Sequence, residues 1–159
     1  MPSPRIIVRH SPIHGRGVFA NRDIPAGTEI ITYQGRLLTH DEADARFGGN
    51  SEEGHTYLFT LNDHYVIDGD DQGNSARWIN HSCSPNCRAV TIEHDSGEPE
   101  RDRIVIESLR DIAKGEELSF DYGIVLDVPH TKARKQIWAC RCGSPECTGT
   151  LLKSKSRRR

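Results

Sequence analysis

The most constraining stretch of the sequence runs from Arg77 to Cys87, near the middle of the chain. Its polar side chains and two thiols surround a single apolar dipeptide, a pattern that fits neither a helical nor a strand period. Asn80 and His81 supply hydrogen-bond donors and acceptors beside a thiol, and the turn residues Ser84-Pro85-Asn86 would fold these groups together. The stretch therefore predicts the wall of a pocket. An ordinary polar turn is the alternative.

The length and the N-terminal residues limit the class of protein. A chain of 159 residues is most simply one domain, and such a domain hides about 68 per cent of its unfolded surface. The sequence contains no run of about 18 apolar residues, and its first five residues lack the apolar core of a signal peptide. We therefore expect an intracellular protein without a membrane segment, cytoplasmic in a bacterium or nuclear in a eukaryote.

Charge is unevenly distributed along the chain. The net charge is −2, but five of the 21 basic residues lie in the last seven positions. The remaining chain carries 16 basic against 23 acidic residues, which favours a basic protein or peptide as partner and disfavours nucleic acid except at the basic tail. A solvated acidic face is the alternative. The carboxylates expected to meet the substrate are Glu52, Glu53, Asp63, Asp68, Asp70 and Asp71.

Short apolar, aromatic and β-branched runs separated by turn residues predict a mostly β domain. The expected strands are 5–9, 18–20, 29–33, 57–61, 65–67, 87–93, 103–108 and 117–122. The capping box from Thr39 to Glu42 predicts a short helix that ends near Phe47. Asn74 should begin a helical turn that leads into the central stretch. The polar, glycine-rich residues 48–55 are expected to form a mobile loop.

The run from Arg77 to Asn86 matches the signature Arg-x-x-Asn-His-Ser-Cys-x-Pro-Asn at every defined position. On these residues the chain resembles the SET-domain protein-lysine methyltransferases, and the resemblance extends from about Arg5 to Leu152. It implies a β-clip-like SET fold of short strands in small sheets, in which this run forms part of the S-adenosylmethionine site and of a C-terminal pseudoknot. The implied parts are a SET domain at 5–125, a post-SET zinc segment at 136–152 and a disordered basic tail at 153–159.

Cys140, Cys142 and Cys147 lie within eight residues, and a structural zinc site needs four such ligands. An odd number of cysteines without a secretion signal argues against disulfides, but three clustered thiols alone leave zinc and coincidence equally open. SET proteins with a cysteine-rich C-terminal segment use the cysteine after Asn-His-Ser, so the resemblance implies Cys83 as the fourth ligand. Cys87 would then be a small buried side chain. Such a zinc ion would hold the C-terminal segment over the central pocket.

The resemblance also implies which residues contact the cofactor. The pattern Gly15-x-Gly17 would by itself predict a tight hairpin. In the SET family this segment faces S-adenosylmethionine, which makes Arg16 and Gly17 candidate contacts. Asn80 and His81 would hold the amino-acid and purine ends of the cofactor. The remaining expected contacts are Tyr33, from a second SET-like pattern, together with Arg77, Tyr122 and Leu151.

Methyl transfer to lysine needs a neutral amine, although the reference pKa of lysine is about 10.4. Burial in an aromatic channel beside a positive charge disfavours the ammonium form. The resemblance implies Tyr122, in Phe-Asp-Tyr, as the catalytic residue and Tyr57 as the second tyrosine of the channel. For Tyr57, a place in the strand core is the alternative.

Phe120 lies two residues before Tyr122 in the same expected strand, so the two side chains should share a face and line the lysine channel together. Phenylalanine there leaves space for an already methylated amine, and the resemblance likewise points to methylation beyond the monomethyl state. We therefore expect a monomeric, S-adenosylmethionine-dependent lysine methyltransferase that contains zinc. The rival hypothesis is a zinc-containing module that has lost catalysis and binds peptide or nucleic acid.

Overall fold

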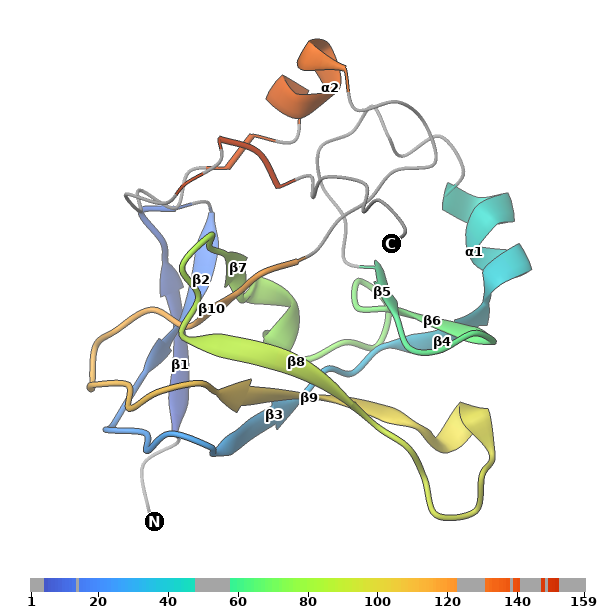
Figure 1. Cartoon of the computed structure of the whole chain (residues 1–159), viewed down its shortest axis with the longest axis horizontal. Helices are drawn as coiled ribbons and strands as arrows, with labels where there is room; N and C mark the ends of the chain where they lie inside the picture. The colour runs from blue at the N-terminus through green and yellow to red at the C-terminus, as the bar shows by residue number, and fades with distance from the viewer. Residues whose placement is uncertain are drawn as a thin grey trace, which may run out of the picture.

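The computed structural model describes residues 5–13, 15–47, 58–122, 131–137, 139–140, 147 and 149–151. Short strands dominate this part of the chain, as predicted (Figure 1). The strands are β1 (Ile6–His10), β2 (Arg16–Ala20), β3 (Glu29–Thr32), β4 (Arg36–Thr39), β5 (Leu58–Thr60), β6 (Tyr65–Asp68), β7 (Asn80–His81), β8 (Cys87–Ile92), β9 (Arg103–Ser108) and β10 (Ser119–Phe120). The helices are α1 (His40–Phe47) and α2 (Lys132–Ile137), with 3₁₀ turns η2 (Ser75–Trp78) and η3 (Pro99–Arg101).

The strands form small separate sheets. β1 and β2 make an antiparallel hairpin, and the orders β3-β9-β8 and β4-β6-β5 make two antiparallel three-stranded sheets. In Figure 1 the sheet β3-β9-β8 runs along the base, between the hairpin and the sheet β4-β6-β5. β7 pairs in parallel with β10, so that Asn80 lies opposite Ser119 and His81 opposite Phe120. This pairing brings the central stretch beside the segment that ends at Tyr122. Residues 123–130, which follow Tyr122 directly in the expected pseudoknot, lie outside the described residues.

Local sequence signals account for several element boundaries. The capping box is formed, since the amide of Glu42 donates to Oγ1 of Thr39 at 3.1 Å and the amide of Thr39 donates to Oε1 of Glu42 at 2.9 Å. Helix α1 accordingly begins at His40. The side chain of Asn74 accepts from the amide of Ala76 at 3.1 Å and caps η2, as predicted.

The expected strand at 117–122 is shorter in the structure, where β10 contains only Ser119 and Phe120. Its partner β7 is also two residues long, and beyond β10 the amide of Tyr122 donates to the side chain of His81. Four elements of the described residues were not predicted: β4, β7, η3 and α2. β4 was missed because it is four residues long and follows Gly35, although Leu38 is 2% exposed and Leu37 37% exposed, as alternation requires.

The core anchors the central stretch. Ile79 is 1% exposed and packs with Ile24, Ile104, Ile106 and other buried residues. Burying such a side chain contributes roughly 1.5–3 kcal/mol. The polar residues on either side of Ile79 are therefore held at fixed positions by an apolar neighbour. In the described ranges, no helix has the length and apolarity needed to cross a membrane.

Candidate active site

Asn80 joins the central stretch to the start of β2. It is 8% exposed, and its Nδ2 donates to the carbonyl of Arg16 at 3.1 Å and to Oε2 of Glu117 at 2.9 Å. The structure thus brings together Arg16 and Asn80, two predicted cofactor contacts more than sixty positions apart. Glu117 was not predicted as a site residue. The signal that could have found it is a carboxylate at the start of a short apolar strand.

His81 and Tyr122 form the second part of the site. Nδ1 of His81 accepts from the backbone amide of Tyr122 at 3.0 Å, so the neutral ring carries its proton on Nε2. Oδ1 of Asp121 lies 3.7 Å from the same Nδ1. Because the bond from the Tyr122 amide is shorter, we assign Nδ1 as a hydrogen-bond acceptor. The two rings meet edge to face, with centroids 5.3 Å apart. The hydroxyl of Tyr122 donates to the carbonyl of Ile79.

A row of four aromatic rings leads away from Tyr122. The ring centroids of Tyr122 and Phe120 are 4.9 Å apart. Those of Phe120 and Phe59 are 5.9 Å apart, and those of Phe59 and Tyr33 are 5.1 Å apart. Phe120 and Tyr122 are therefore neighbours, as expected, although Tyr122 lies beyond the strand. Tyr33 is 6% exposed and lines a separate cavity of about 350 Å³ with Glu100. Within the described row of rings, the two phenylalanines lie between Tyr33 and Tyr122.

Two arginines lie over the ring of Trp78. The guanidinium carbons of Arg16 and Arg77 are 5.2 Å and 4.5 Å from the ring centroid, within the range of cation–π interaction. Nη1 of Arg77 donates to the carbonyl of Gly69 at 3.3 Å. Nε of Arg77 is buried and has no hydrogen-bond partner within the described ranges. Both arginines were predicted cofactor contacts, whereas Trp78 was not predicted as a site residue.

Two of the four predicted zinc ligands come together. Sγ of Cys83 lies 3.9 Å from Sγ of Cys140 and 3.6 Å from Nε2 of His81, and the three atoms lie within 4.8 Å of one another. Zinc bound to two thiolates at about 2.3 Å in a tetrahedron separates them by about 3.8 Å. The donor set fits zinc. The third member of this cluster, His81, was not predicted as a ligand, and its Nε2 carries the proton of the neutral ring, so it lies beside the two thiols and is not counted among the ligands.

The other C-terminal residues are only partly described. The amide of Cys140 donates to the carbonyl of Gly149 at 3.1 Å, and Ala139 pairs with Thr150 in a short bridge. Sγ of Cys147 accepts from the amide of Gly149 at 3.4 Å but is not part of the three-residue cluster. Leu151 is half-buried and follows this bridge. Tyr57 and Cys142 lie outside the described residues.

Cys87 is the spare thiol that the sequence analysis expected. It is fully buried at 0% exposure, and burial raises the pKa of its thiol to about 11. The amide of Leu109, the first residue after β9, donates to the carbonyl of Asn86, which precedes Cys87 in the chain. Cys87 is thus a neutral core residue, and this prediction is confirmed.

The acidic face expected near 48–71 is smaller than predicted. Asp68 is 5% exposed, and its Oδ1 accepts from the amide of Asp70 at 3.0 Å. This carboxylate closes a turn and does not face solvent. Asp71 lies 3.4 Å from Nη1 of Arg36, whereas Asp63 and Asp70 are exposed. Two of the six carboxylates, at positions 52 and 53, lie outside the described residues.

The sequence profile described as SET domain matches residues 15–123. This chain belongs to the SET domain family. The matched range of this SET domain contains Asn80, His81, Cys83 and Tyr122. Cys140 and Cys147 follow it, and Ser11 precedes it.

Several histone methyltransferases are similar to this SET domain. Human histone-lysine N-methyltransferase 2B is 39% identical over 143 residues, which cover 88% of this chain and 5% of that protein. The H3 lysine-4 specific histone-lysine N-methyltransferase of Chaetomium globosum is also 39% identical over 143 residues, covering 89% of this chain and 12% of that protein. Histone-lysine N-methyltransferase trithorax of Drosophila melanogaster is 36% identical over 141 residues, which cover 88% of this chain and 4% of that protein. The SET domain described here thus corresponds to a small part of each relative.

Proposed function

We propose that this SET domain methylates lysine side chains of a basic, histone-like protein, with S-adenosylmethionine as the methyl donor. The observation that carries the proposal is the parallel pairing of β7 with β10, which places Asn80 and His81 beside Phe120 and Tyr122. Groups suited to binding a cofactor and groups suited to lining a lysine channel therefore meet at one place. The relatives, which are named histone-lysine N-methyltransferases, support the same reaction.

The donor set of the site suits S-adenosylmethionine. Nε of Arg77 is a buried donor without a partner among the described residues, next to the ring of Trp78. Such a donor suits a polar ligand atom, because an unpaired buried polar group is costly. Aromatic faces attract positive charge, and the ring of Tyr122 lies against His81. We propose that Arg16, Arg77, Asn80 and His81 hold the cofactor, with Gly17, Tyr33 and Leu151 as the further predicted contacts.

Tyr122 is the proposed catalytic residue. When bound, S-adenosylmethionine supplies an electrophilic methyl group on a sulfonium. The hydroxyl proton of Tyr122 points to the carbonyl of Ile79, so its oxygen presents lone pairs in other directions, as an acceptor for a polarised methyl or for the amine. Tyr57 is proposed as the second tyrosine of the channel. These rings exclude water and keep the lysine amine aligned and neutral.

The number of methyl groups depends on the space beside Tyr122. The ring of Phe120 lies 4.9 Å from that of Tyr122 and carries no hydroxyl group. A methylated amine must turn its lone pair back toward the sulfonium, and a phenylalanine leaves more room for that turn than a tyrosine. We propose that the enzyme adds more than one methyl group.

Zinc is proposed to be structural. Cys83 and Cys140 are the best supported ligands, with Cys142 and Cys147 completing the predicted set of four. The metal would connect the segment around Cys140 to Cys83 in the central stretch. This arrangement would hold Leu151 near the cofactor site.

The decisive experiment incubates the purified protein with S-adenosylmethionine and core histones, then measures lysine masses by mass spectrometry. We expect methylated lysine, and about 100-fold less of it from the Tyr122→Phe variant within the same time. Binding of S-adenosylmethionine and histone without any transfer would favour the non-catalytic binding module. Failure to bind the cofactor would contradict the proposal.

A further inference from the structure

We infer that Glu117 is a positioning residue that shapes the cofactor site through Asn80 and the residues around Gly17. The inference rests on the proposed function, because it assigns a cause to the geometry of the proposed cofactor contacts. Glu117 lies between Glu116 and Leu118, at an isolated bridge with Phe19. Its side chain points into the space between three segments of the chain.

The carboxylate of Glu117 accepts hydrogen bonds from two of these segments. The hydroxyl of Ser11, which is 3% exposed, lies 2.7 Å from Oε2 and 2.9 Å from Oε1. Nδ2 of Asn80 donates to the same Oε2 at 2.9 Å. Charged acceptors make hydrogen bonds roughly twice as strong as neutral ones. Glu117 therefore ties the loop after β1 to β7.

The third segment is the start of β2, where Gly17 has no side chain. A Cβ atom built on Gly17 would lie 2.3 Å from Oε2 of Glu117 and 2.9 Å from Cβ of Ser11. Real Cβ atoms do not approach other atoms that closely, so any other residue at this position would displace Glu117. The space beside Gly17 is thus occupied by the carboxylate. Gly17 serves the cofactor site by admitting Glu117, which in turn holds Asn80.

The backbone of Glu117 is held independently of its side chain. The carbonyl of Glu117 accepts from Nδ2 of Asn86 at 2.9 Å, and the amide of Ser119 donates to Oδ1 of Asn86 at 2.9 Å. The amide of Leu118 donates to the carbonyl of Val18 at 2.7 Å. A side-chain substitution at 117 should therefore leave this segment in place.

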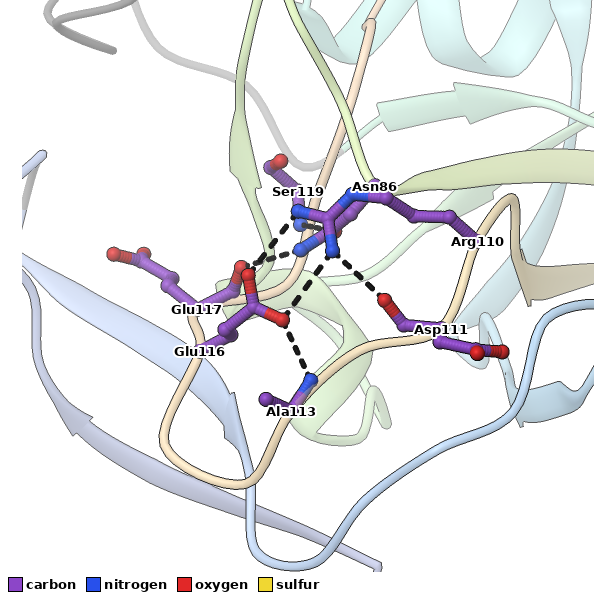
Figure 2. A network of polar contacts seen from close by, with 7 residues as sticks. All are labelled: Asn86, Arg110, Asp111, Ala113, Glu116, Glu117 and Ser119. Atoms are coloured by element: carbon purple, nitrogen blue, oxygen red, sulfur yellow. Dashed lines mark hydrogen bonds and ion pairs between the residues drawn. The ribbon is translucent and has the colours of Figure 1, made fainter.

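Glu116 provides a matched control. Figure 2 shows the carboxylates of Glu116 and Glu117 pointing away from each other. The Glu116 carboxylate accepts from Arg110 at 3.2 Å and 3.3 Å and from the amide of Ala113 at 2.6 Å, and none of these groups belongs to the proposed cofactor site. Substitution of either residue removes one carboxylate from the same stretch of backbone. Only the change at 117 alters the surroundings of Asn80.

Removing the Glu117 carboxylate removes one of the acceptors of the Asn80 side-chain amide and the acceptor of the Ser11 hydroxyl. Arg16 and Asn80 would then be less well aligned before the cofactor arrives, and the cofactor would bind more weakly. Glutamine can still accept from Asn80 and donate to the hydroxyl of Ser11, so it should restore most of the alignment. Among the described contacts, the Glu117 side chain bonds to Ser11 and Asn80 and to none of the rings proposed to line the lysine channel. The KM for the peptide should change little.

The experiment measures S-adenosylhomocysteine affinity by calorimetry for wild type, Glu117→Ala, Glu117→Gln and Glu116→Gln. We expect the Kd to rise about tenfold or more for Glu117→Ala, and to stay within about threefold for the other two, because loss of a partly buried charged acceptor has effects of this order. At saturating cofactor, turnover of Glu117→Ala should fall far less than its affinity. An unchanged Kd for Glu117→Ala, with melting temperature lowered as in Glu116→Gln, would overturn the inference and show a purely structural role.

Amide hydrogen exchange without ligand separates this inference from the proposed function. We expect faster exchange in residues 15–18 and 80–82 for Glu117→Ala than for Glu117→Gln. If wild type fails to bind S-adenosylhomocysteine, the proposed function is wrong, whereas exchange still tests whether Glu117 holds these segments. Equal exchange in wild type and Glu117→Ala would overturn the inference even if the wild type is an active methyltransferase.

Discussion

Tyr122 donates its backbone N–H to Nδ1 of His81 at 3.0 Å, while Nε2 of the same imidazole lies 3.6 Å from Sγ of Cys83. One ring therefore joins the proposed catalytic residue to the proposed metal site. With Nδ1 as acceptor, the proton of the neutral ring lies on Nε2 and faces sulfur, where it can stabilise a thiolate. The ring orientation is determined from both sides.

The Tyr122→Phe substitution should lower turnover about 100-fold and change cofactor affinity little. The change removes one hydroxyl near the reacting methyl and keeps the ring that packs on His81; losing a single well-placed polar group at a reacting centre has effects of this size. Single-turnover rates and calorimetry measure the two quantities. Asn80→Ala should show the reverse order, with affinity lost first, and the opposite pattern in both variants would mean that the roles are misassigned.

The Phe120→Tyr substitution should shift the product toward monomethyl-lysine with most of the total activity retained. The added hydroxyl occupies space beside Tyr122, whose ring is 4.9 Å away. Mass spectrometry of product peptides at long times gives the distribution. If the wild type yields only monomethyl product after all unmethylated substrate is consumed, another residue narrows the channel.

Freshly prepared reduced protein should contain one zinc ion per chain, measured by elemental analysis. Removing the metal with a strong chelator should make Cys83 and Cys140 reactive toward iodoacetamide at pH 8. Cys87 should stay unreactive while the protein is folded, because it is fully buried and burial raises the pKa of its thiol to about 11. Zinc content near zero, or rapid alkylation of Cys87 with Cys83 protected, would contradict the metal assignment.

The Glu116→Gln substitution should destabilise the protein at neutral pH and have little effect in acid. The hydrogen bond from Arg110 and that from the Ala113 amide lower the pKa of Glu116 below its usual value of 4.5. Because the folded-state pKa is depressed, the stabilisation is present above the unfolded-state pKa and is lost as pH falls through the folded-state pKa. The pair is solvent-exposed, so the difference in unfolding free energy should be below about 1 kcal/mol. Denaturant unfolding at pH 7 and pH 3 tests this, and an equal difference at both pH values would argue against it.

Local patterns predicted much of the fold because they act over a few residues. The Thr39 to Glu42 capping box and the Asn74 cap are such signals, and both appear in the structure. The antiparallel pairing of Phe59 with Ile67 follows from two apolar runs joined by a short turn. Signals of this kind fix where elements begin and which neighbours pair.

The central part of the site depends on contacts that the local sequence does not encode. β7 and β10 are two residues each and pair in parallel, so no alternation of residue types marks them. Ser11 and Glu117 meet across 106 positions, which only the tertiary fold brings together. The resemblance to SET proteins indicated Asn80 and His81 as cofactor contacts. It did not indicate Glu117, whose carboxylate accepts a hydrogen bond from Asn80.

Ile79 links the integrity of the core to the chemistry of the site. Its side chain is buried at 1% exposure, its amide donates to the carbonyl of Ala76, and its carbonyl accepts the hydroxyl of Tyr122. The residue that accepts the hydroxyl of Tyr122, the proposed catalytic residue, thus belongs to the buried core, and core segments are expected to open only when the whole domain unfolds. Heat inactivation that starts at Tyr122 would therefore coincide with cooperative melting of the whole domain, without an earlier loss of activity in an otherwise native protein.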